Sequence, residues 1–554
     1  MRLFAGALLA LLGVVLVPAA AMADGGACPR PAAGSEIAQP PDLTSVNGVL
    51  ETSLSYRTDT DDEGRTLYCF VTPDGKMSPT FHVLPGDRIL IHLTNALPPS
   101  AGGMDMAITG TVCGDTDQTD TSVNMHFHGM NVTPSCHGDE VIHTVVNAGS
   151  SFDYAFRIPP TEPPGLYWYH PHIHGISSIE VQGGASGLIE VEGIANIQPA
   201  VSGLPQRYIV LRDEPRRGDL HGVSNPLIPV PGWDVSVNYV TVPFPKYTPA
   251  TITMQSGQPE FWRVANAAAN TIMDLRIKYD GVEQPLQIVG FDGVPTGSQD
   301  GTRQGVIVTQ TGVLLPPAGR VEFVVAPPGA GVTSAVLETE TIAGGPASDS
   351  NPRRTLANIL VGNGAPALKK VPPRNGPPTK QLFENLADAK VTARRHLYFI
   401  EIPSRAELPP PSGAMAMAHG ASKAPGGETV NFYIAVEGQP LQLFNPDNPP
   451  AIVTTRGAVE EWTIQNRSPE VHEFHIHQIH FLVEEVNGVP IPKDQQQFYD
   501  TYQVGFWKGR GRYPSIKVKM DFRGAVVGDF VYHCHILDHE DGGMMAIIRV
   551  LPKT

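Results

Sequence analysis

The sequence predicts an all-β protein built from three related domains. Glycine (56 residues) and proline (53 residues) make up about a fifth of the 554-residue chain, which favours many short strands joined by turns. A glycine and an asparagine nine residues apart recur in three segments, GDRILIHLTN (86–95), GQPEFWRVAN (257–266) and GAVEEWTIQN (457–466). Apolar or aromatic residues largely fill every second position between them, as half-buried strands require. The repeat therefore indicates three β-domains.

The first residues predict export from the cell. Met1 and Arg2 precede an uncharged apolar run that ends in Ala-Met-Ala before Asp24, which is the pattern of a secretory signal peptide over residues 1–23. An uncleaved membrane anchor is the alternative, because residues 3–23 carry no charge. No later stretch is long and apolar enough to span a bilayer, so we expect an exported protein, periplasmic or extracellular, with no membrane span in its mature form. The formal net charge of −16 argues against a nucleic-acid partner.

The five cysteines are of two kinds. Cys28, Cys69, Cys113 and Cys136 lie in the first quarter of the chain, and in an oxidising compartment they predict two disulfide bonds. Three pairings are possible, and the position of Cys113 and Cys136 on either side of a histidine pair favours a bond between those two. Cys534 stands apart from the others, among histidines.

Histidines are clustered far beyond chance. The chain has 19 histidines, and random placement would give about 0.65 His-x-His pairs, whereas five are present. They lie in four clusters, HFHG (126–129), YHPHIHG (169–175), HEFHIHQIHF (472–481) and YHCHILDH (532–539). Residues i and i+2 of a strand share a face, so each pair can present two imidazoles to one place. Four such pairs can converge as eight imidazoles.

The last cluster predicts two linked metal sites. If His533 and His535 point one way from a strand, Cys534 points the other way, so its thiolate would bind a different metal. His472 and His539 can complete a Cys-His-His set, with Met544 as a weak axial ligand, which is a blue-copper electron-transfer arrangement. Zinc would accept the same atoms, but it is redox-inert and would leave the link between the two sites without a use.

In this order along the chain, the four clusters resemble the copper motifs of the multicopper oxidase family, which includes laccases, ascorbate oxidases and cuprous oxidases. The resemblance implies three cupredoxin-like Greek-key β-barrel domains and four copper ions per chain. The type 1 copper would take His472, Cys534, His539 and axial Met544. The type 2 copper would take His126 and His475. The type 3 pair would take His128, His170, His172, His477, His533 and His535, which places the trinuclear cluster between the first and third domains.

These motifs and repeats suggest domain boundaries. We expect a first cupredoxin domain at 24–200 that holds half of the trinuclear site, and a second at 201–364. A proline-rich linker at 365–390 would lead to a third domain at 391–554, with the type 1 copper and the other half of the trinuclear site.

The middle domain differs from the third at the histidine positions. The offsets from the repeat asparagine that give His472, His475 and His477 in the third domain give Ile272, Leu275 and Ile277 in the second. We therefore interpret the middle domain as a spacer without copper.

Two carboxylates are candidates for a proton relay, because reduction of dioxygen to water consumes protons. The family places an acid shortly after its first motif, and Asp139 lies eleven residues after His128. Glu540, next to His539, resembles an acid of bacterial members. The alternative is that both are exposed loop acids.

The third motif departs from the family pattern. Proline commonly follows its first histidine and glycine its third, where this chain has Glu473 and Gln478. The departure bears on His472, which in the family faces the reducing substrate, so Glu473 is a third candidate catalytic residue. We expect His174 and His480 to be hydrogen-bonded neighbours rather than ligands.

These features predict an oxidase that takes electrons singly from a substrate and reduces dioxygen to water. We expect a monomer with a phenolic or aromatic donor, as in laccase-like members. Cu(I), the donor of copper-tolerance members, is the alternative, because Met415, Met417 and His419 are soft groups that could capture it. A non-catalytic copper-binding or electron-transfer protein needs only the Cys534 site, so eight paired histidines would have no role. A copper nitrite reductase also needs fewer histidines, and usually two domains.

Overall fold

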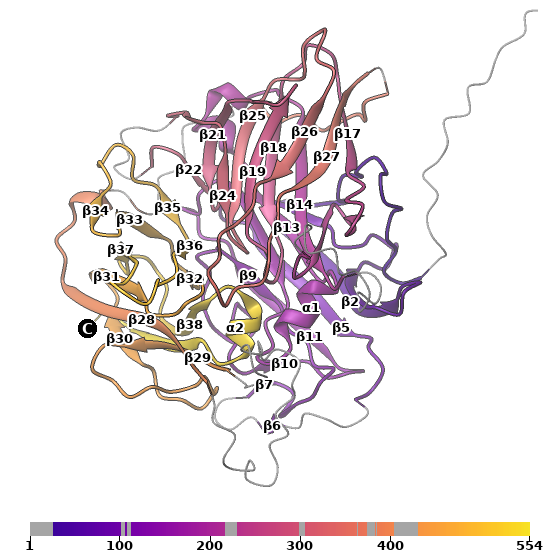
Figure 1. Ribbon diagram of the computed structural model, residues 1–554. Helices are drawn as coiled ribbons and strands as arrows, with labels where there is room; N and C mark the ends of the chain where they lie inside the picture. The colour runs from indigo at the N-terminus through magenta and orange to yellow at the C-terminus, as the bar shows by residue number, and fades with distance from the viewer. Residues whose placement is uncertain are drawn as a thin grey trace, which may run out of the picture.

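Three pairs of β-sheets follow one another along the chain, as the all-β prediction requires (Figure 1). The computed structural model describes residues 26–100, 106–107, 112–216, 230–298, 305–362, 364–373, 383, 385–403 and 430–553. The predicted signal peptide, residues 374–382 and 384 of the proline-rich linker, and the segment with Met415, Met417 and His419 lie outside the described residues.

The first pair of sheets forms a β-sandwich. One sheet has the order β1 (Asp42–Thr44), β4 (Thr80–Val83), β13 (Gly187–Val191), β12 (Gly165–His170), β9 (His126–His128). The other has the order β11 (Ser151–Arg157), β5 (Arg88–Asn95), β2 (Val49–Thr60), β3 (Thr66–Val71). Short strands pair beside them: β6 (Met106–Ala107) with β8 (Asp117–Gln118), and β7 (Cys113–Gly114) with β10 (Thr144–Val145). Burial alternates along β5, which places Ile89, Ile91 and Leu93 in the core between the sheets.

The second pair forms the middle sandwich. One sheet runs β16 (Val240–Val242), β15 (Asp234–Val237), β14 (Gln206–Glu214), β18 (Glu260–Asn266), β25 (Arg320–Val325), β21 (Leu286–Phe291), β22 (Val294–Pro295), with β23 (Val308–Gln310) on β21. The other runs β17 (Ala250–Met254), β27 (Arg354–Val361), β26 (Ala335–Thr339), β19 (Met273–Tyr279), β20 (Val282–Glu283), with β24 (Val313–Leu315) on β19. Leu275 and Ile277 belong to the core of this sandwich.

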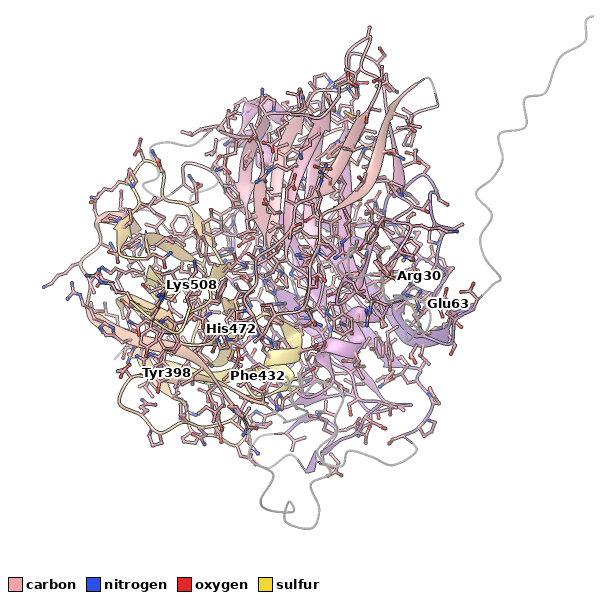
Figure 2. The ribbon with its side chains drawn as sticks, in the orientation of Figure 1. Arg30, Glu63, Tyr398, Phe432, His472 and Lys508 are labelled. Atoms are coloured by element: carbon pink, nitrogen blue, oxygen red, sulfur yellow. A yellow bond between two sulfur atoms is a disulfide. The ribbon has the colours of Figure 1, made fainter. Side chains whose placement is uncertain are left out.

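The third pair forms the last sandwich. One sheet runs β29 (Val430–Val436), β28 (Ala393–Pro403), β31 (Val459–Asn466), β37 (Ser515–Asp521), β33 (Phe481–Val486), β34 (Val489–Pro490), with β35 (Phe498–Tyr499) on β33. The other runs β30 (Ile452–Thr455), β39 (Met545–Leu551), β38 (Gly528–Cys534), β32 (His472–Ile476), β36 (Thr501–Val504). Figure 2 shows His472 and Phe432 on the side of this sandwich that carries the α2 helix (Leu537–Asp541).

The three repeated segments form β5, β18 and β31, and their asparagines make the same contacts. The Nδ2 of Asn95, Asn266 and Asn466 donates to two backbone carbonyls in each sandwich, at 2.7–3.2 Å. Each Oδ1 accepts the backbone N–H two residues later, at 2.8–3.3 Å. Because buried carbonyls without a donor cost free energy, this role explains why the asparagine recurs in all three sandwiches.

Short helices connect the strands, and two of them join the first sandwich to the third. These two are α1 (Ser177–Gln182) and α2; the 3₁₀ turns are η1 (Ile194–Asn196), η2 (Pro199–Val201) and η3 (Leu386–Asp388). The N–H groups of Gly175 and Ser178 donate to the carboxylate of Asp541, at 2.7 and 2.9 Å. In the described part of the chain, no helix has the length and apolar character needed to cross a membrane.

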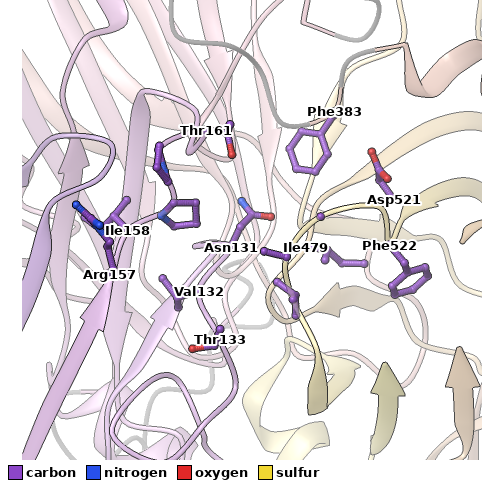
Figure 3. A pocket seen from close by; sticks show the side chains of 15 residues that line it. Asn131, Val132, Thr133, Arg157, Ile158, Thr161, Phe383, Ile479, Asp521 and Phe522 are labelled. Carbon is purple, nitrogen blue, oxygen red and sulfur yellow. The ribbon is translucent and has the colours of Figure 1, made fainter. Parts of the chain in front are cut away.

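A cavity of about 310 Å³ also lies between the first and third sandwiches (Figure 3). Asn131 and Ile158 line it from the first sandwich, and Ile479 and Phe522 from the third. No predicted ligand lines the cavity, so it is separate from the metal centres described below.

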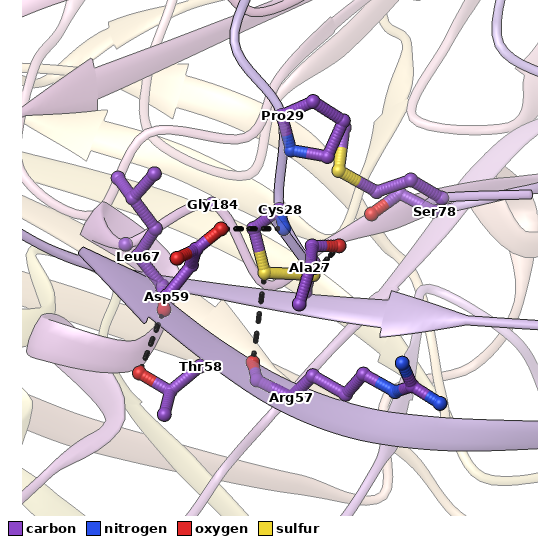
Figure 4. The surroundings of a disulfide bond; sticks show 12 residues. Ala27, Cys28, Pro29, Arg57, Thr58, Asp59, Leu67, Ser78 and Gly184 are labelled. Atoms are coloured by element: carbon purple, nitrogen blue, oxygen red, sulfur yellow. Dashed lines mark hydrogen bonds between the residues drawn. A yellow bond between two sulfur atoms is a disulfide. The ribbon is translucent and has the colours of Figure 1, made fainter. Parts of the chain in front are cut away.

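Two disulfide bonds join the four cysteines near the N-terminus, as predicted. Cys28 pairs with Cys69, and Cys113 pairs with Cys136, which is the pairing that the sequence favoured. The first bond fastens the N-terminal segment to β3, and the N–H of Cys28 also donates to Asp59 at 3.2 Å (Figure 4). Cys534 is free and buried.

Candidate metal centre

Four buried strands bring the histidine clusters together. In the first sandwich, β9 pairs with β12 so that His126 lies opposite His170. In the third, β32 pairs with β38 so that His475 lies opposite His533. Alternate side chains of a strand share a face, so both pairs of strands direct their histidines into the contact between the two sandwiches.

The eight histidines of these clusters form one group, which we call the eight-histidine centre: His126, His128, His170, His172, His475, His477, His533 and His535. Three subsets each place one ring nitrogen per residue within 4.8 Å of the others: His126, His128 and His475; His128, His170 and His535; His172, His477 and His533. The Nε2 atoms of His172 and His477 lie 3.4 and 3.2 Å from the Nε2 of His533. Ring nitrogens at these distances are better explained as ligands of a shared cation than as hydrogen-bond partners of one another.

The outer nitrogens of several rings are held by acceptors, which fixes the tautomer. The Nδ1 of His170 faces the carbonyl of Pro171 at 2.8 Å, and the Nδ1 of His533 faces the carbonyl of Cys534 at 2.9 Å. A carbonyl only accepts, so Nδ1 carries the proton and Nε2 keeps its lone pair. Buried nitrogens without a hydrogen-bond partner among the described residues include the Nε2 of His126, His170 and His475 and the Nδ1 of His128. Such orphaned lone pairs fit a bound metal.

A second centre surrounds Cys534, on the opposite face of β38. The Sγ of Cys534 lies 3.5 Å from the Nδ1 of His472 and 3.7 Å from the Nδ1 of His539. The two Nδ1 atoms are 3.1 Å apart. Met544 is fully buried in the same core, and its carbonyl accepts the N–H of Cys534 at 3.1 Å. One thiolate and two imidazoles with a nearby thioether are the ligand set that copper prefers.

Burial favours the neutral imidazoles that a metal requires. Burial lowers the pKa of the eight histidines, for His533 to about 3, and neighbouring histidines lower most of these values further. Neutral rings keep a lone pair for coordination near neutral pH.

Asp139 and Glu540 are buried beside the eight-histidine centre, which excludes the exposed-loop alternative. Both oxygens of Asp139 lie 3.0 Å from the Nδ1 of His126, and Gln478 donates to Asp139 at 2.5 Å. Burial raises the pKa of Asp139 to about 7, although hydrogen bonds from Phe127 and Gln478 oppose the rise. Burial, and then the nearby Asp541, raise the pKa of Glu540, whose carboxylate lies 3.3 Å from the Nδ1 of His533.

The other predicted neighbours are placed as follows. Glu473 is fully buried and accepts from Gln503 at 3.2 Å; on β32 it alternates with His472, so it lies on the other side of the strand. His480 is a hydrogen-bonded neighbour, as predicted, with its Nε2 2.7 Å from the carbonyl of Asp292. His174 is also buried, with its ring 4.8 Å from that of Phe444.

Sequence reasoning missed several acids and one arginine around the two centres. Asp500 contacts His128 and His475, and Arg320 of the middle sandwich contacts Asp500. Near Cys534, Glu401 lies 3.1 Å from the Nε2 of His472, and Glu470 lies 3.6 Å from the Nε2 of His539. These residues carry no spacing signal in the sequence, because their contacts come from different elements.

Comparison with known proteins identifies the family. Models of multicopper oxidase domains match residues 112–195 and 422–554, and these two stretches contain all the predicted copper ligands. The chain belongs to the multicopper oxidase family. This family comprises copper oxidoreductases that use dioxygen.

Relatives of this multicopper oxidase include bacterial, archaeal and plant proteins. A multicopper oxidase of Staphylococcus haemolyticus is 36% identical over 95 residues, which span 16% of this chain and only 20% of that protein. A laccase of Haloferax volcanii is 23% identical over 446 residues, 76% of this chain and 66% of that protein.

Solved structures show the same fold over nearly the whole chain. A multicopper oxidase of Campylobacter jejuni, described as a metallo-oxidase, has a TM-score of 0.63 at 20% identity and covers 94% of this chain and 96% of its own. A laccase-like multicopper oxidase of Ochrobactrum sp. has a TM-score of 0.61 at 20% identity, with 93% and 100% covered. The three sandwiches are therefore the three cupredoxin-like domains of this fold, as predicted.

Proposed function

We propose that this multicopper oxidase takes electrons singly from a reducing substrate at the Cys534 centre and passes them to dioxygen at the eight-histidine centre. The run His533-Cys534-His535, at the end of β38, supports the proposal, because Cys534 lies with His472 and His539 while both flanking imidazoles lie in the eight-histidine centre. Bound copper would supply the one-electron redox chemistry and the place where dioxygen is reduced.

The ligand atoms support an assignment of four coppers. We assign His472, Cys534, His539 and axial Met544 to a type 1 copper, with Nδ1 of both histidines and the thiolate as donors. We assign His126 and His475 to a type 2 copper. The remaining residues of the eight-histidine centre, in the subsets with His128 and with His172, would hold the type 3 pair.

Protons must reach the eight-histidine centre, because each dioxygen reduced to water takes up four protons. We propose that Asp139 and Glu540 hold these protons. Both carboxyl groups are buried against ring nitrogens of the centre, and burial favours their protonated form. Glu473 is buried on the inner side of β32, away from the outward side of His472. We therefore propose that Glu473 does not contact the electron donor.

For the donor, our first candidate is a phenol, as in laccase-like relatives. A phenol that gives up one electron also releases its proton. Glu401 lies beside the outward nitrogen of His472, with its side chain only 9% exposed, and its carboxylate can accept that proton.

A metal cation is the second candidate, and the acids around the Cys534 centre favour it. Glu401 and Glu470 lie against the outward nitrogens of the two histidines. Burial, and then the negative charges of Glu401, Asp349 and Asp538, raise the pKa of Glu470 to about 8. A cation would relieve this repulsion.

Copper counting and oxygen uptake test the proposal. Copper-loaded protein should hold four coppers per chain and consume oxygen with a methoxyphenol or with Cu(I). One copper per chain and no oxygen uptake would instead identify an electron carrier.

Two variants, Glu401→Gln and Glu470→Gln, distinguish the two candidate electron donors. If the natural donor is a cation, both variants should slow Cu(I) oxidation at least 10-fold and change phenol oxidation less. A loss confined to phenol oxidation, and mainly in Glu401→Gln, would support the phenol. Glu437→Gln, an exposed acid that follows β29, is the matched control.

We further propose that the protein acts as an exported monomer, in the periplasm or outside the cell. The two disulfide bonds support an oxidising compartment. The domain boundaries at residues 200, 364 and 390 remain our proposal; β14 begins at Gln206 and β28 at Ala393, close to two of them.

A further inference from the structure

Arg320 of the middle sandwich is buried at the point where all three sandwiches meet. It is 1% exposed, it begins β25, and its Nη1 donates to Asp500 of the third sandwich at 2.8 Å. Its Nη2 donates to the second oxygen of the same carboxylate, so the contact is a two-pronged ion pair. Arg320 Nε also donates to the carbonyl of Leu166 in β12, at 3.2 Å.

Asp292, also from the middle sandwich, accepts hydrogen bonds from the backbone of both partners of this ion pair. Its Oδ1 accepts the backbone N–H of Arg320 at 2.8 Å. Its Oδ2 accepts the backbone N–H groups of Asp500 and Thr501, at 3.2 and 3.4 Å. Asp292 is itself 2% exposed. The position of Asp500 therefore depends on two residues of the middle sandwich.

Asp500 acts on two histidines of the eight-histidine centre at once. Its carboxylate lies 3.1 Å from the Nε2 of His128, and its backbone carbonyl lies 2.8 Å from the Nδ1 of His475. Both oxygens can only accept, so His128 carries its proton on Nε2 and His475 carries it on Nδ1. The lone pairs left for coordination are Nδ1 of His128 and Nε2 of His475, the two nitrogens without a partner among the described residues.

Glycine at position 129 permits this close approach. Gly129 follows His128 and has φ of +84°. A Cβ there would lie 2.4 Å from Nη2 of Arg320 and 2.5 Å from a carboxylate oxygen of Asp500. The guanidinium and the carboxylate thus occupy the space beside the backbone of a predicted ligand.

We propose that Arg320 and Asp292 are positioning residues of the eight-histidine centre, which act through Asp500 to set the ring orientation and tautomer of His128 and His475. The middle sandwich, predicted as a spacer, then contributes to copper binding without supplying a ligand. The inference rests on the proposed copper ligands.

Arg207 provides the control for a purely structural role. It lies in β14 of the same sheet, is fully buried, and pairs with Glu260 at 2.7 and 2.9 Å; its hydrogen bonds go to Glu260 and the carbonyl of Thr253, and neither residue is a predicted ligand. Buried ion pairs contribute little net stability but are costly to break from one side. Arg207→Gln and Arg320→Gln should therefore lower the thermal stability of the copper-free protein alike.

Copper affinity and electron paramagnetic resonance distinguish the two variants. Removing an outer partner of a metal ligand typically weakens metal affinity 10–100-fold. Arg320→Gln should bind copper at the eight-histidine centre 10–100-fold more weakly, against a competing chelator, and change the type 2 signal, with the type 1 colour retained. Arg207→Gln should match the wild type in copper affinity, in the type 2 signal and in the type 1 colour. Asp292→Asn, a milder change, should shift affinity in the same direction if Arg320→Gln does not fold.

Two results would overturn the inference. Wild-type affinity and type 2 signal in Arg320→Gln, or in Asp292→Asn if only that variant folds, would reduce the cluster to a structural contact. An equal loss of copper affinity in Arg207→Gln would likewise show that the effect of Arg320→Gln is only structural. If instead the wild-type protein bound no copper at this centre, the proposed function itself would fail, and the two failures are thereby distinguished.

Discussion

Cys534 is the residue on which the proposed electron route depends. It is the free cysteine of the described chain, it is buried, and its sulfur faces His472 and His539. A thiolate bound to Cu(II) gives an intense blue colour, which a serine hydroxyl does not give. We expect Cys534→Ser to lose both the blue absorption and oxygen uptake.

The control for this change lies in the other centre. Since no ligand of the eight-histidine centre is altered, three coppers per chain should remain in Cys534→Ser, measured by metal analysis. A blue band that survived would contradict the type 1 assignment.

Asp139 is the second residue whose chemistry can be tested alone. Its carboxyl group lies against His126, and an amide at this position would keep the shape but could not cycle a proton. We expect Asp139→Asn to slow turnover by about 10²-fold, the scale of a lost general acid, while reduction of the type 1 site in the absence of oxygen stays fast.

Stopped-flow reduction and steady-state oxygen uptake separate these two steps. Asp153→Asn is the matched control, because Asp153 lies on nearby β11 with a side chain 72% exposed. Normal turnover in Asp139→Asn would remove Asp139 from the proton route.

At the scale of single elements, the repeated asparagine stabilises each sandwich through its hydrogen bonds. In β18, Asn266 donates to the carbonyls of Thr271 and Leu315, at 2.9 and 3.0 Å. Asn266→Ala would leave both buried carbonyls without a donor, at a cost of about 1–3 kcal/mol each. We expect a lower free energy of unfolding for the copper-free protein, measured with denaturant.

Asn358→Ala is the comparison for that change. Asn358 is exposed in β27 of the same sandwich, and exposed substitutions usually change stability by less than about 0.5 kcal/mol. Equal losses in the two variants would show that the asparagine of the repeat has no special role.

At the scale of the whole molecule, charged residues bind the first sandwich to the middle one. His82 of β4 lies 2.6 Å from Asp42 and 3.2 Å from Glu190, and Glu190 also pairs with Arg263 of the middle sandwich at 2.7 Å. Glu192 and the ring of Tyr208 also face His82. Burial alone would lower the pKa of His82, but its hydrogen bonds to Asp42 and Glu190, together with the negative charges of these two residues, outweigh burial and raise the pKa to about 9.

This shift predicts how stability depends on pH. The pKa of His82 is higher in the folded protein than in the unfolded chain, so its stabilising effect is full below about pH 6.5 and is lost as the pH rises through about 9. We expect His82→Gln to lower Tm clearly at pH 6 and much less at pH 10. His92→Gln, an exposed change in β5, is the control. A Tm difference that grew with pH would contradict the assignment.

Much of the proposed copper chemistry could be predicted from the sequence, because it depends on local spacing. Residues two apart on a strand share a face whatever the rest of the fold does, so the His-x-His pairs already indicated convergent imidazoles. The same alternation separated Cys534 from His533 and His535. The repeated Gly-x₈-Asn segments indicated three β-domains, because each copy performs the same local hydrogen bonding.

Tertiary structure alone decided what surrounds those ligands. Arg320 and Asp500 are 180 residues apart, and no periodic pattern connects a residue of the middle sandwich to one of the third. The burial of Asp139 and Glu540 and the acids at the outward nitrogens of His472 and His539 likewise arise only when separate elements pack. Local spacing determines which ligands a strand can offer, whereas the packing of distant elements determines the dielectric, the hydrogen-bond partners and hence the protonation of each ligand.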